Sequence, residues 1–435
     1  MRKVTAILSA LALQACAYPH TPPALAPVTR PAGPATGVLA NTQARTPVTI
    51  LVSIDGFRPD YLNRGVTPVL NRLASGGVTG PMRPSFPSKT FPNHWTLVTG
   101  DVPDRHGIVA NTMEDAARPG ETFTMATDDP FWWNAAEPVW VAAERAGIRT
   151  ATMLWPGSNV AWGSTEKKGD HGITAGGTRP QDWQQFNANL TARQRVDTVI
   201  DWLRRPAATR PRLVMLYFDT VDSAGHEFGP AAPQTTAAVA AVDTAIGSLV
   251  DGLAGIGQPA NLVIVADHGM AATATERTIA LDAIAPAADY RVIESGPYAT
   301  LVPAATREVA VERAMTARHP HMTCWPKRAI PARLHYGTNP RVPPILCLAE
   351  SGWLILKSPP SKPVDLGNHG YDNRAPDMRA LFVANGPAFV PGKRIGAFDN
   401  VAIYPLLRDL IGLPPATGID GTDSPFRRVL VRNPG

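Results

Sequence analysis

The segment VTILVSIDG, residues 48–56, places a carboxylate at the end of a buried strand and decides the fold. Its first seven residues form a mostly apolar run without alternation, which is typical of a strand covered on both faces. Four further runs share this character: Thr150–Leu154, Leu213–Phe218, Leu262–Ala266 and Ala380–Val383. The sequence therefore predicts a sheet with both faces covered.

Helical patterns lie between these predicted strands. They cover Pro68–Ala74, Pro138–Ala146, Ala192–Leu203 and the Ala-rich stretch Thr235–Leu253. Strands that alternate with helices predict an α/β fold with a doubly wound, mostly parallel sheet. Ligands of such sheets bind beyond the carboxyl ends of the strands, so the residues that directly follow each strand are candidates for function.

The composition indicates a globular protein. The chain has 435 residues, of which 44% are hydrophobic and 18% charged, and its formal net charge is +5. Its basic residues form no run longer than a pair, whereas nucleic-acid binders cluster them, so we expect no nucleic-acid partner. After the N-terminus no apolar stretch reaches 18 residues, which argues against a second membrane span.

The N-terminus has the pattern of a secretory signal over residues 1–17. A basic pair precedes a short apolar run over residues 4–13, and small residues follow. Two cleavage patterns fit. Leu13-Gln14-Ala15-Cys16 resembles a bacterial lipobox, which would attach lipid to Cys16 and anchor the protein to the membrane, whereas Ala15-Cys16-Ala17 fits an A-x-A site. Both patterns predict an exported, periplasmic protein.

Residues 18–46 are rich in Pro and Ala and predict an extended linker. One folded domain is expected over residues 47–430, and residues from about 280 to 366 predict an insertion that caps its core. Cys324 and Cys347 lie in this insertion. Two thiols in an oxidising compartment favour a disulfide, and two unrelated buried thiols are the alternative.

Carboxylates and imidazoles follow three of the predicted strands. Asp55 follows the first strand, Asp222 and His226 come shortly after residues 213–218, and Asp267-His268 follows residues 262–266. A lone Asp there is more often a helix cap or a turn residue. Three Asp and two His exceed one four-ligand zinc site and point to a pair of Zn²⁺ ions, for which His369 supplies a sixth ligand.

The segment around Asp222 and His226 is expected to form a loop. Gly225 between them and Pro230 beyond them both favour a loop over a helix. Convergence of the two side chains on one ion does not require a helix. The remaining histidines, among them His94 and His106, are expected to hydrogen-bond locally.

Several motifs occur along the chain in one order. They are Asp55-Gly56-Phe57-Arg58, Lys89-Thr90-Phe91-Pro92-Asn93-His94, Val98-Thr99-Gly100, His106-Gly107-Ile108-Val109-Ala110-Asn111, Asp222-x3-His226, Asp267-His268-Gly269-Met270 and His369-Gly370. This set resembles the nucleotide pyrophosphatase/phosphodiesterase family of the alkaline phosphatase superfamily, over about residues 48 to 425. The resemblance implies the alkaline phosphatase type of fold, so that residues 47–430 would be a phosphodiesterase catalytic domain.

The resemblance also implies roles for the candidate site residues. One zinc would be held by Asp222, His226 and His369, and the other by Asp55, Asp267 and His268 together with Thr90, the residue that matches the nucleophile. Thr90 would form a covalent intermediate with the substrate. Asn111 and the backbone amide of Thr90 would hold a nonbridging phosphate oxygen, as an oxyanion hole does.

Three aromatic residues match positions that contact the base in relatives that cleave nucleotides. Phe91 would stack on one face of the base, Phe186 would form a second wall where the family commonly has Tyr, and Tyr217 would lie at the edge. Packing in the core is the alternative for these rings.

The leading hypothesis is therefore an exported, zinc-dependent phosphodiesterase that cleaves small nucleotide substrates to nucleoside monophosphates. A phosphomonoesterase or a phosphonate hydrolase of the same superfamily is the alternative enzyme, and it would need cationic side chains around the terminal phosphate. Lys89 precedes Thr90, but its direction cannot be told from sequence. A non-catalytic envelope lipoprotein would be expected to lack a ligand, and all six are present.

Overall fold

Residues 45–165 and 176–431 are described by a computed structural model of the chain. Cys16, the predicted signal segment and almost all of the predicted linker lie outside the described residues.

The central sheet of the described chain has the strand order β19–β2–β18–β9–β1–β8–β6–β7. The strands from β9 to β7 are parallel to one another, whereas β18 pairs antiparallel with β9 and β2. Every residue of β1 and β8 is buried, as continuous apolar runs predict. The strands are β1 (Val48–Ile54), β2 (Val78–Thr79), β6 (Thr150–Met153), β7 (Asp182–Gln184), β8 (Leu213–Phe218), β9 (Ala260–Val265), β18 (Phe382–Asn385) and β19 (Lys393–Arg394).

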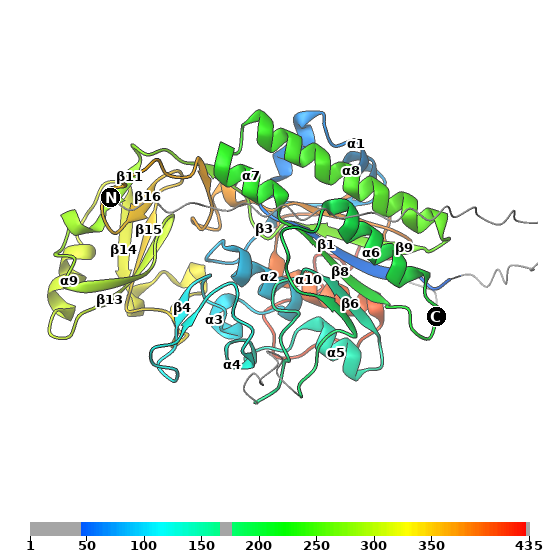
Figure 1. The fold of residues 1–435 in the computed structure, drawn as a ribbon, viewed down its shortest axis with the longest axis horizontal. Coiled ribbons are helices and arrows are strands. Elements are labelled where there is room, and N and C mark those ends of the chain that lie inside the picture. Colours follow the sequence, from blue (N-terminus) through cyan, green and yellow to red (C-terminus); the bar gives the residue numbers. More distant parts are fainter. Residues whose placement is uncertain (1–44, 166–175, 432–435) are drawn as a thin grey trace, which may run out of the picture. The chain divides into compact units, whose positions relative to one another are not determined.

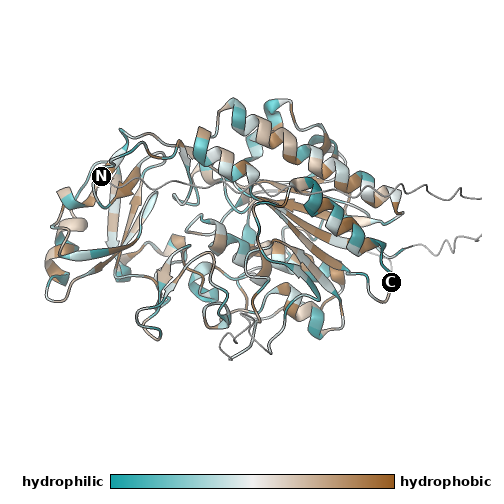
Figure 2. Cartoon of the chain, viewed as in Figure 1, coloured by the Kyte–Doolittle hydropathy of each residue, from teal (hydrophilic) through white to brown (hydrophobic). Residues whose placement is uncertain are grey.

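Helices cover both faces of this sheet (Figure 1). On one face α8 packs against α1, α6 and α7, and on the other α10 contacts β1, α2 and α5. Figure 2 shows apolar residues concentrated on the strands between these layers. The helices are α1 (Pro68–Ser75), α2 (Thr90–Thr99), α5 (Val139–Arg145), α6 (Ala192–Arg204), α7 (Thr220–Phe228), α8 (Pro233–Gly255) and α10 (Ile403–Ile411).

Short elements connect these layers. They are β3 (Met82–Arg83) paired with β20 (Phe398–Asp399), β4 (Met113–Glu114) paired with β5 (Thr122–Phe123), β10 (Ala271–Ala272) paired with β17 (Gly367–Asn368), α3 (Pro103–His106) and α4 (Pro130–Trp133).

Helix α8 carries a buried carboxylate that caps a neighbouring helix. Asp243 accepts hydrogen bonds from the backbone N–H groups of Val69 (3.1 Å) and Leu70 (2.7 Å), at the start of α1.

Helix α8 is long and apolar enough to cross a membrane, judged by length and composition alone. The sequence argues against a second membrane span because it lacks a long uninterrupted apolar stretch. In the structure the buried residues of α8 include Val239, Val242, Ile246, Leu249 and Leu253, and the helix packs against three other helices.

A smaller antiparallel sheet, β12–β13–β15–β14, caps the fold with a second cluster of buried residues (Figure 1). Cys324 on β14 lies opposite Cys347 on β15, and the two form a disulfide, as predicted. The elements of this part are β11 (Thr278–Ala280), β12 (Tyr290–Glu294), β13 (Tyr298–Pro303), α9 (Glu308–Met315), β14 (Met322–Pro326), β15 (Ile345–Ala349) and β16 (Leu354–Leu356).

The predicted fold class is confirmed, but the loop expected around Asp222 and His226 is wrong. Both residues lie on helix α7, one turn apart. Gly225 lies within the helix rather than in a turn, and its neighbour there is the flexible side chain of Met270. A Cβ on Gly367 of β17 would lie 2.2 Å from the carbonyl oxygen of Gly225, so Gly367 lets β17 approach the backbone of α7.

The disulfide should stabilise the fold without affecting the chemistry. A double Cys324→Ser, Cys347→Ser variant should unfold more easily, by about 3 kcal/mol in the chain-entropy model of a short closed loop. Chemical denaturation of both proteins measures the difference. Peptide mapping of exported wild-type protein without reduction should recover a linked pair, and two freely alkylated thiols would contradict the bond.

Candidate metal centre

Three neighbouring strands deliver polar side chains to one edge of the central sheet. Asp55 follows β1, and Asp267 follows shortly after β9, which is paired in parallel with β1. Helix α7 follows β8 on the other side of β1 and presents Asp222 and His226. His369 directly follows β17, whose pairing with β10 returns the chain to the same edge. These side chains therefore meet because parallel strands end together.

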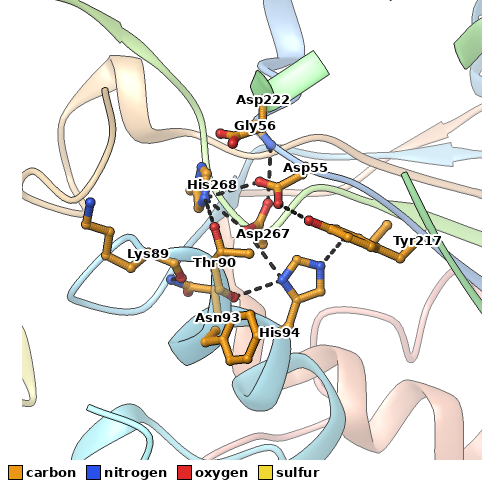
Figure 3. Close-up of polar contacts among 12 residues, drawn as sticks. Asp55, Gly56, Lys89, Thr90, Asn93, His94, Tyr217, Asp222, Asp267 and His268 are labelled. Carbon is orange, nitrogen blue, oxygen red and sulfur yellow. Dashed lines mark hydrogen bonds and ion pairs between the residues drawn. The ribbon is translucent and has the colours of Figure 1, made fainter. Parts of the chain in front are cut away.

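Three oxygen atoms lie close to Nε2 of His268 (Figure 3). The distances are 2.9 Å to Oδ2 of Asp267, 3.3 Å to Oδ1 of Asp55 and 3.2 Å to Oγ1 of Thr90. Asp55, Asp267 and His268 form a buried group whose ligand atoms all lie within 4.8 Å of one another. Such a cluster of nitrogen and oxygen donors has the composition of a zinc site.

A second group overlaps the first. Asp222, His268 and His369 also have ligand atoms within 4.8 Å of one another. Nε2 of His369 lies 3.6 Å from Oδ1 of Asp222, and Nε2 of His226 lies 3.5 Å from Oδ2 of the same carboxylate. The structure therefore brings all six predicted ligands together, three around Asp222 and three around Asp55.

All three histidines present the same ring nitrogen to the carboxylates. Their Nδ1 atoms lie within hydrogen-bond distance of backbone carbonyl oxygens: His226 to Gly367 (2.8 Å), His268 to Gly269 (2.9 Å) and His369 to Ser88 (3.0 Å). A carbonyl oxygen only accepts, so Nδ1 carries the proton and Nε2 presents a lone pair. A lone pair that faces a carboxylate is repulsive unless a cation lies between them. This arrangement is typical of metal-binding histidines.

The electrostatics of the cluster also fit a cation. Burial raises the pKa of Asp55 well above its usual range, and Asp267 and Asp222 raise it further. Burial likewise raises the pKa of Asp267, with Asp222 as the next cause. Among the described residues, one oxygen of each of these three carboxylates is buried without a hydrogen-bond partner. Buried, unpaired negative charge of this kind is stable only when a cation compensates it, so the residues present fit bound metal ions.

Thr90 is held at the first position of helix α2. Lys89 before it is extended, and the carbonyl oxygen of Thr90 accepts a hydrogen bond from Nδ1 of His94 (2.8 Å). Ser53 on β1 contacts the other nitrogen of the same ring (2.9 Å). Burial lowers the pKa of His94 to about 3, so the ring is neutral at physiological pH. His94 is thus a buried support for the backbone of Thr90, and its spacing of four residues on one helix is the sequence signal for this contact.

Asn111 lies beside the first turn of α2. Its Oδ1 accepts a hydrogen bond from the backbone N–H of Phe91 (3.0 Å). This bond orients the side-chain amide and leaves its Nδ2 group as a donor. The ring of Phe91 is partly exposed and packs against Phe123 and Trp133, with ring centroids 6.2 and 5.9 Å apart.

The other two predicted substrate residues differ in their surroundings. Phe186 is 51% exposed, and its ring centroid lies 6.1 Å from that of Tyr217. Tyr217 is buried and donates a hydrogen bond from its hydroxyl to Oδ2 of Asp55 (2.6 Å). The hydroxyl of Tyr217 therefore orients Asp55, a candidate metal ligand. The sequence gives no signal for this contact, because Tyr217 is simply one residue of an apolar strand.

Comparisons with known proteins agree with this geometry. A family model described as type I phosphodiesterase / nucleotide pyrophosphatase matches residues 49–372. The chain is 37% identical over 409 residues to an uncharacterized pyrophosphatase/phosphodiesterase of Schizosaccharomyces pombe, covering 87% of this chain and 80% of that one. It is 35% identical over 407 residues to the bis(5'-adenosyl)-triphosphatase enpp4 of Mus musculus, covering 92% and 85%.

Other relatives are longer or have solved structures. Ectonucleotide pyrophosphatase/phosphodiesterase family member 1 of Rattus norvegicus is 33% identical, and the match covers 85% of this chain but 41% of that protein. The structure of murine family member 5, an inactive threonine-to-alanine variant in complex with AMP, superimposes with a TM-score of 0.82 at 32% identity. That match covers 89% of this chain and all of the other.

Removal of divalent metal should destabilise the protein. A cation that binds only the folded state adds about 2.7 kcal/mol at a hundredfold excess over its Kd, so a strong chelator should lower the Tm. Calorimetry with and without chelator measures the shift. An Asp55→Asn, Asp267→Asn variant is the matched control, because it lacks the charge that the cation neutralises. An unchanged wild-type Tm would argue against a metal centre.

Proposed function

Since the chain belongs to the type I phosphodiesterase / nucleotide pyrophosphatase family, we propose that it hydrolyses nucleotide phosphodiester and pyrophosphate bonds to nucleoside monophosphates. The observation that carries the proposal is the convergence of Oγ1 of Thr90 with unpaired carboxylate oxygens and imidazole lone pairs. One relative is named a bis(5'-adenosyl)-triphosphatase and another was solved with AMP, which supports nucleotides with a 5'-phosphate as the substrate class.

We assign the candidate ligands to two zinc sites. One site comprises Asp222, His226 and His369, and the other comprises Asp55, Asp267, His268 and Thr90. When bound, two Zn²⁺ ions stabilise negative charge on a phosphate and favour the ionised form of a nearby hydroxyl. The bond from Tyr217 to Asp55 and the three bonds from histidine Nδ1 atoms orient these ligands.

Thr90 is the proposed nucleophile. Its hydroxyl loses its proton to solvent, and the ionised Oγ1 forms a bond to the phosphorus while the bond from phosphorus to the leaving oxygen breaks and the electron pair departs with that oxygen. Water then releases the nucleoside monophosphate from the covalent threonine ester. Thr90 opens helix α2, where the helix dipole favours an anion and the backbone N–H of Thr90 itself can donate, since that of Phe91 already donates to Asn111. Asn111 is positioned to donate its Nδ2 amide to a nonbridging oxygen.

A diester is favoured over a monoester because neither Arg58, three residues after Asp55, nor Arg195, the partner of Asp219, is free to bind a terminal phosphate in bidentate fashion. Arg58 pairs with Asp60 and Asp377, and Arg195 donates to Asp219. A monoester carries an additional charge on its terminal phosphate and is usually met by such a guanidinium. Phe91 and the exposed Phe186 then hold the base of the nucleotide, with Tyr217 behind Phe186.

We further propose that the enzyme works after export. The signal pattern over residues 1–17 supports this, and so does the disulfide between Cys324 and Cys347, because such bonds persist in oxidising compartments. The two cleavage patterns around Cys16 correspond to a lipid-anchored and a soluble periplasmic form.

Replacing Thr90 tests the nucleophile. Thr90→Ala should lower kcat by several powers of ten, since it removes the only oxygen that forms the covalent ester. Thr90→Ser should keep a measurable part of the activity because it retains a hydroxyl. Steady-state kinetics on thymidine 5'-(4-nitrophenyl) phosphate measures both, with metal content as the control. Near-normal turnover of Thr90→Ala would mean that water attacks directly.

Replacing Phe91 tests the base site. Stacking contributes about 1 to 3 kcal/mol per base, so Phe91→Ala should lower kcat/KM for ATP far more than for bis(4-nitrophenyl) phosphate. Phe186→Ala is the matched variant for the second wall, because this exposed ring can be removed without opening the core. Equal losses on both substrates would mean that Phe91 only packs against Phe123 and Trp133.

A further inference from the structure

Lys89, next to the proposed nucleophile, has a largely buried side chain whose ammonium group is unpaired among the described residues. The residue is 8% exposed. Among residues 45–165 and 176–431, its ammonium group makes no hydrogen bond and has no carboxylate oxygen within 4.0 Å. Most of the side chain is buried while Nζ keeps contact with solvent, so an anion from solvent can reach the ammonium group and pair with it. The position therefore indicates an anionic ligand that completes the site.

The packing fixes the direction of this side chain. A Cβ added to Gly370 would lie 2.9 Å from Cε of Lys89 and 3.3 Å from Cδ1 of Tyr298, so the glycine leaves room for the lysine stem. Gly370 follows His369, one of the proposed ligands. The lysine stem thus passes the residue next to a proposed ligand, and Figure 3 shows the ammonium group on the opposite side of Thr90 and His268 from Tyr217.

The nearby carboxylates are committed elsewhere. Glu294, Asp222 and Asp365 interact with Lys89 electrostatically without forming an ion pair. Glu294 accepts a hydrogen bond from the backbone N–H of Thr112 (3.2 Å), and Asp222 faces the histidine nitrogens. Oδ2 of Asp365 lies 3.8 Å from Nδ1 of His226. An anion that enters the site from solvent can therefore pair with the ammonium group.

Lys89 and Phe91 lie on either side of Thr90 and have different surroundings. Phe91 packs with Phe123 and Trp133, whereas Lys89 runs past Gly370 and Tyr298. A nucleotide whose base stacks on Phe91 directs the rest of its phosphate chain away from that ring. On the proposed function, the phosphate chain beyond the reacting phosphorus would then lie on the side of Thr90 along which Lys89 runs.

We propose that Lys89 binds the phosphate of the leaving group and so selects substrates whose leaving group is a phosphate or a pyrophosphate. This inference rests on the proposed function. When Oγ1 of Thr90 bonds to the phosphorus, the bond to the bridging oxygen breaks and the electron pair stays on the departing pyrophosphate. The ammonium group compensates the charge that develops there, a contact that is stronger in the transition state than in the ground state. Lys89 is thus a specificity-determining residue.

A comparison of two leaving groups tests the proposal. Lys89→Met should lower kcat/KM for ATP at least tenfold more than for thymidine 5'-(4-nitrophenyl) phosphate, whose leaving group carries no phosphate. Lys89→Arg should recover part of the ATP activity. Inorganic pyrophosphate should inhibit hydrolysis of the nitrophenyl ester at least tenfold more weakly in Lys89→Met than in wild type, whereas inhibition by AMP should be unchanged.

Two further variants separate this role from a structural one. Glu294→Gln should leave the ratio of the two substrates within a fewfold of wild type, and a loss of ATP activity equal to that of Lys89→Met would mean that the two residues only stabilise each other. Lys393→Met removes the same charge on exposed strand β19 and should change neither substrate. Equal losses of Lys89→Met on both substrates, or unchanged inhibition by pyrophosphate, would overturn the proposal.

Activity of Lys89→Met on an aryl monophosphate is the remaining measurement. If Lys89→Met mainly lost activity on this monoester, the ammonium group would contact the reacting phosphate rather than the leaving group, and the assignment would be wrong. Wild-type protein that hydrolyses neither ATP nor the nitrophenyl ester would contradict the proposed function itself. Calorimetric titration with inorganic pyrophosphate would then still test whether Lys89 binds an anion.

Discussion

The structure depends on three carboxylates that face one another at the edge of the sheet, the buried Asp55 and Asp267 and the partly buried Asp222. Asp55, Asp222 and Asp267 each leave one oxygen without a hydrogen bond. Imidazole lone pairs add to the excess of negative potential, because every Nδ1 proton of the three neighbouring histidines is directed to a backbone carbonyl. A fold stable without cations would pair such groups with one another. This cluster keeps them unpaired, which is the arrangement that strong binding of divalent metal requires.

Close backbone approaches make that cluster possible. Gly56 has a φ of +67°, and a Cβ there would lie 3.1 Å from Oδ1 of Asp222. Gly367 lets β17 approach the backbone of α7, which places His226 and His369 on either side of the same carboxylate. Side chains at these glycines would push the two halves of the donor set apart. The glycines of these motifs thus set the distances between the ligand atoms.

The sequence was sufficient for the sheet and for the donor set, but not for the contacts that support them. Uninterrupted apolar strands such as Leu213–Phe218 have few alternatives to a covered parallel sheet, and Asp or His directly after them must share its edge. The helix at Asp222 was not predicted, because local propensity assigns Gly225 to a turn, whereas the residue lies within the helix beside Met270. The roles of the Tyr217 hydroxyl and the Lys89 ammonium group could not be predicted, because the residues that surround them, Asp55 and Gly370, lie far away in the chain.

Three consecutive residues at the start of α2 point into three different parts of the site. The backbone changes from extended at Lys89 to helical at Thr90, so adjacent side chains leave the chain in different directions. Lys89 passes Gly370, Thr90 faces His268, and Phe91 joins the aromatic residues near Trp133. In the proposed complex, a cation, a hydroxyl and an aromatic ring would therefore meet the outer phosphate, the reacting phosphorus and the base of a nucleotide. Because one helix terminus fixes all three, a shift of that terminus would change affinity, turnover and selectivity together.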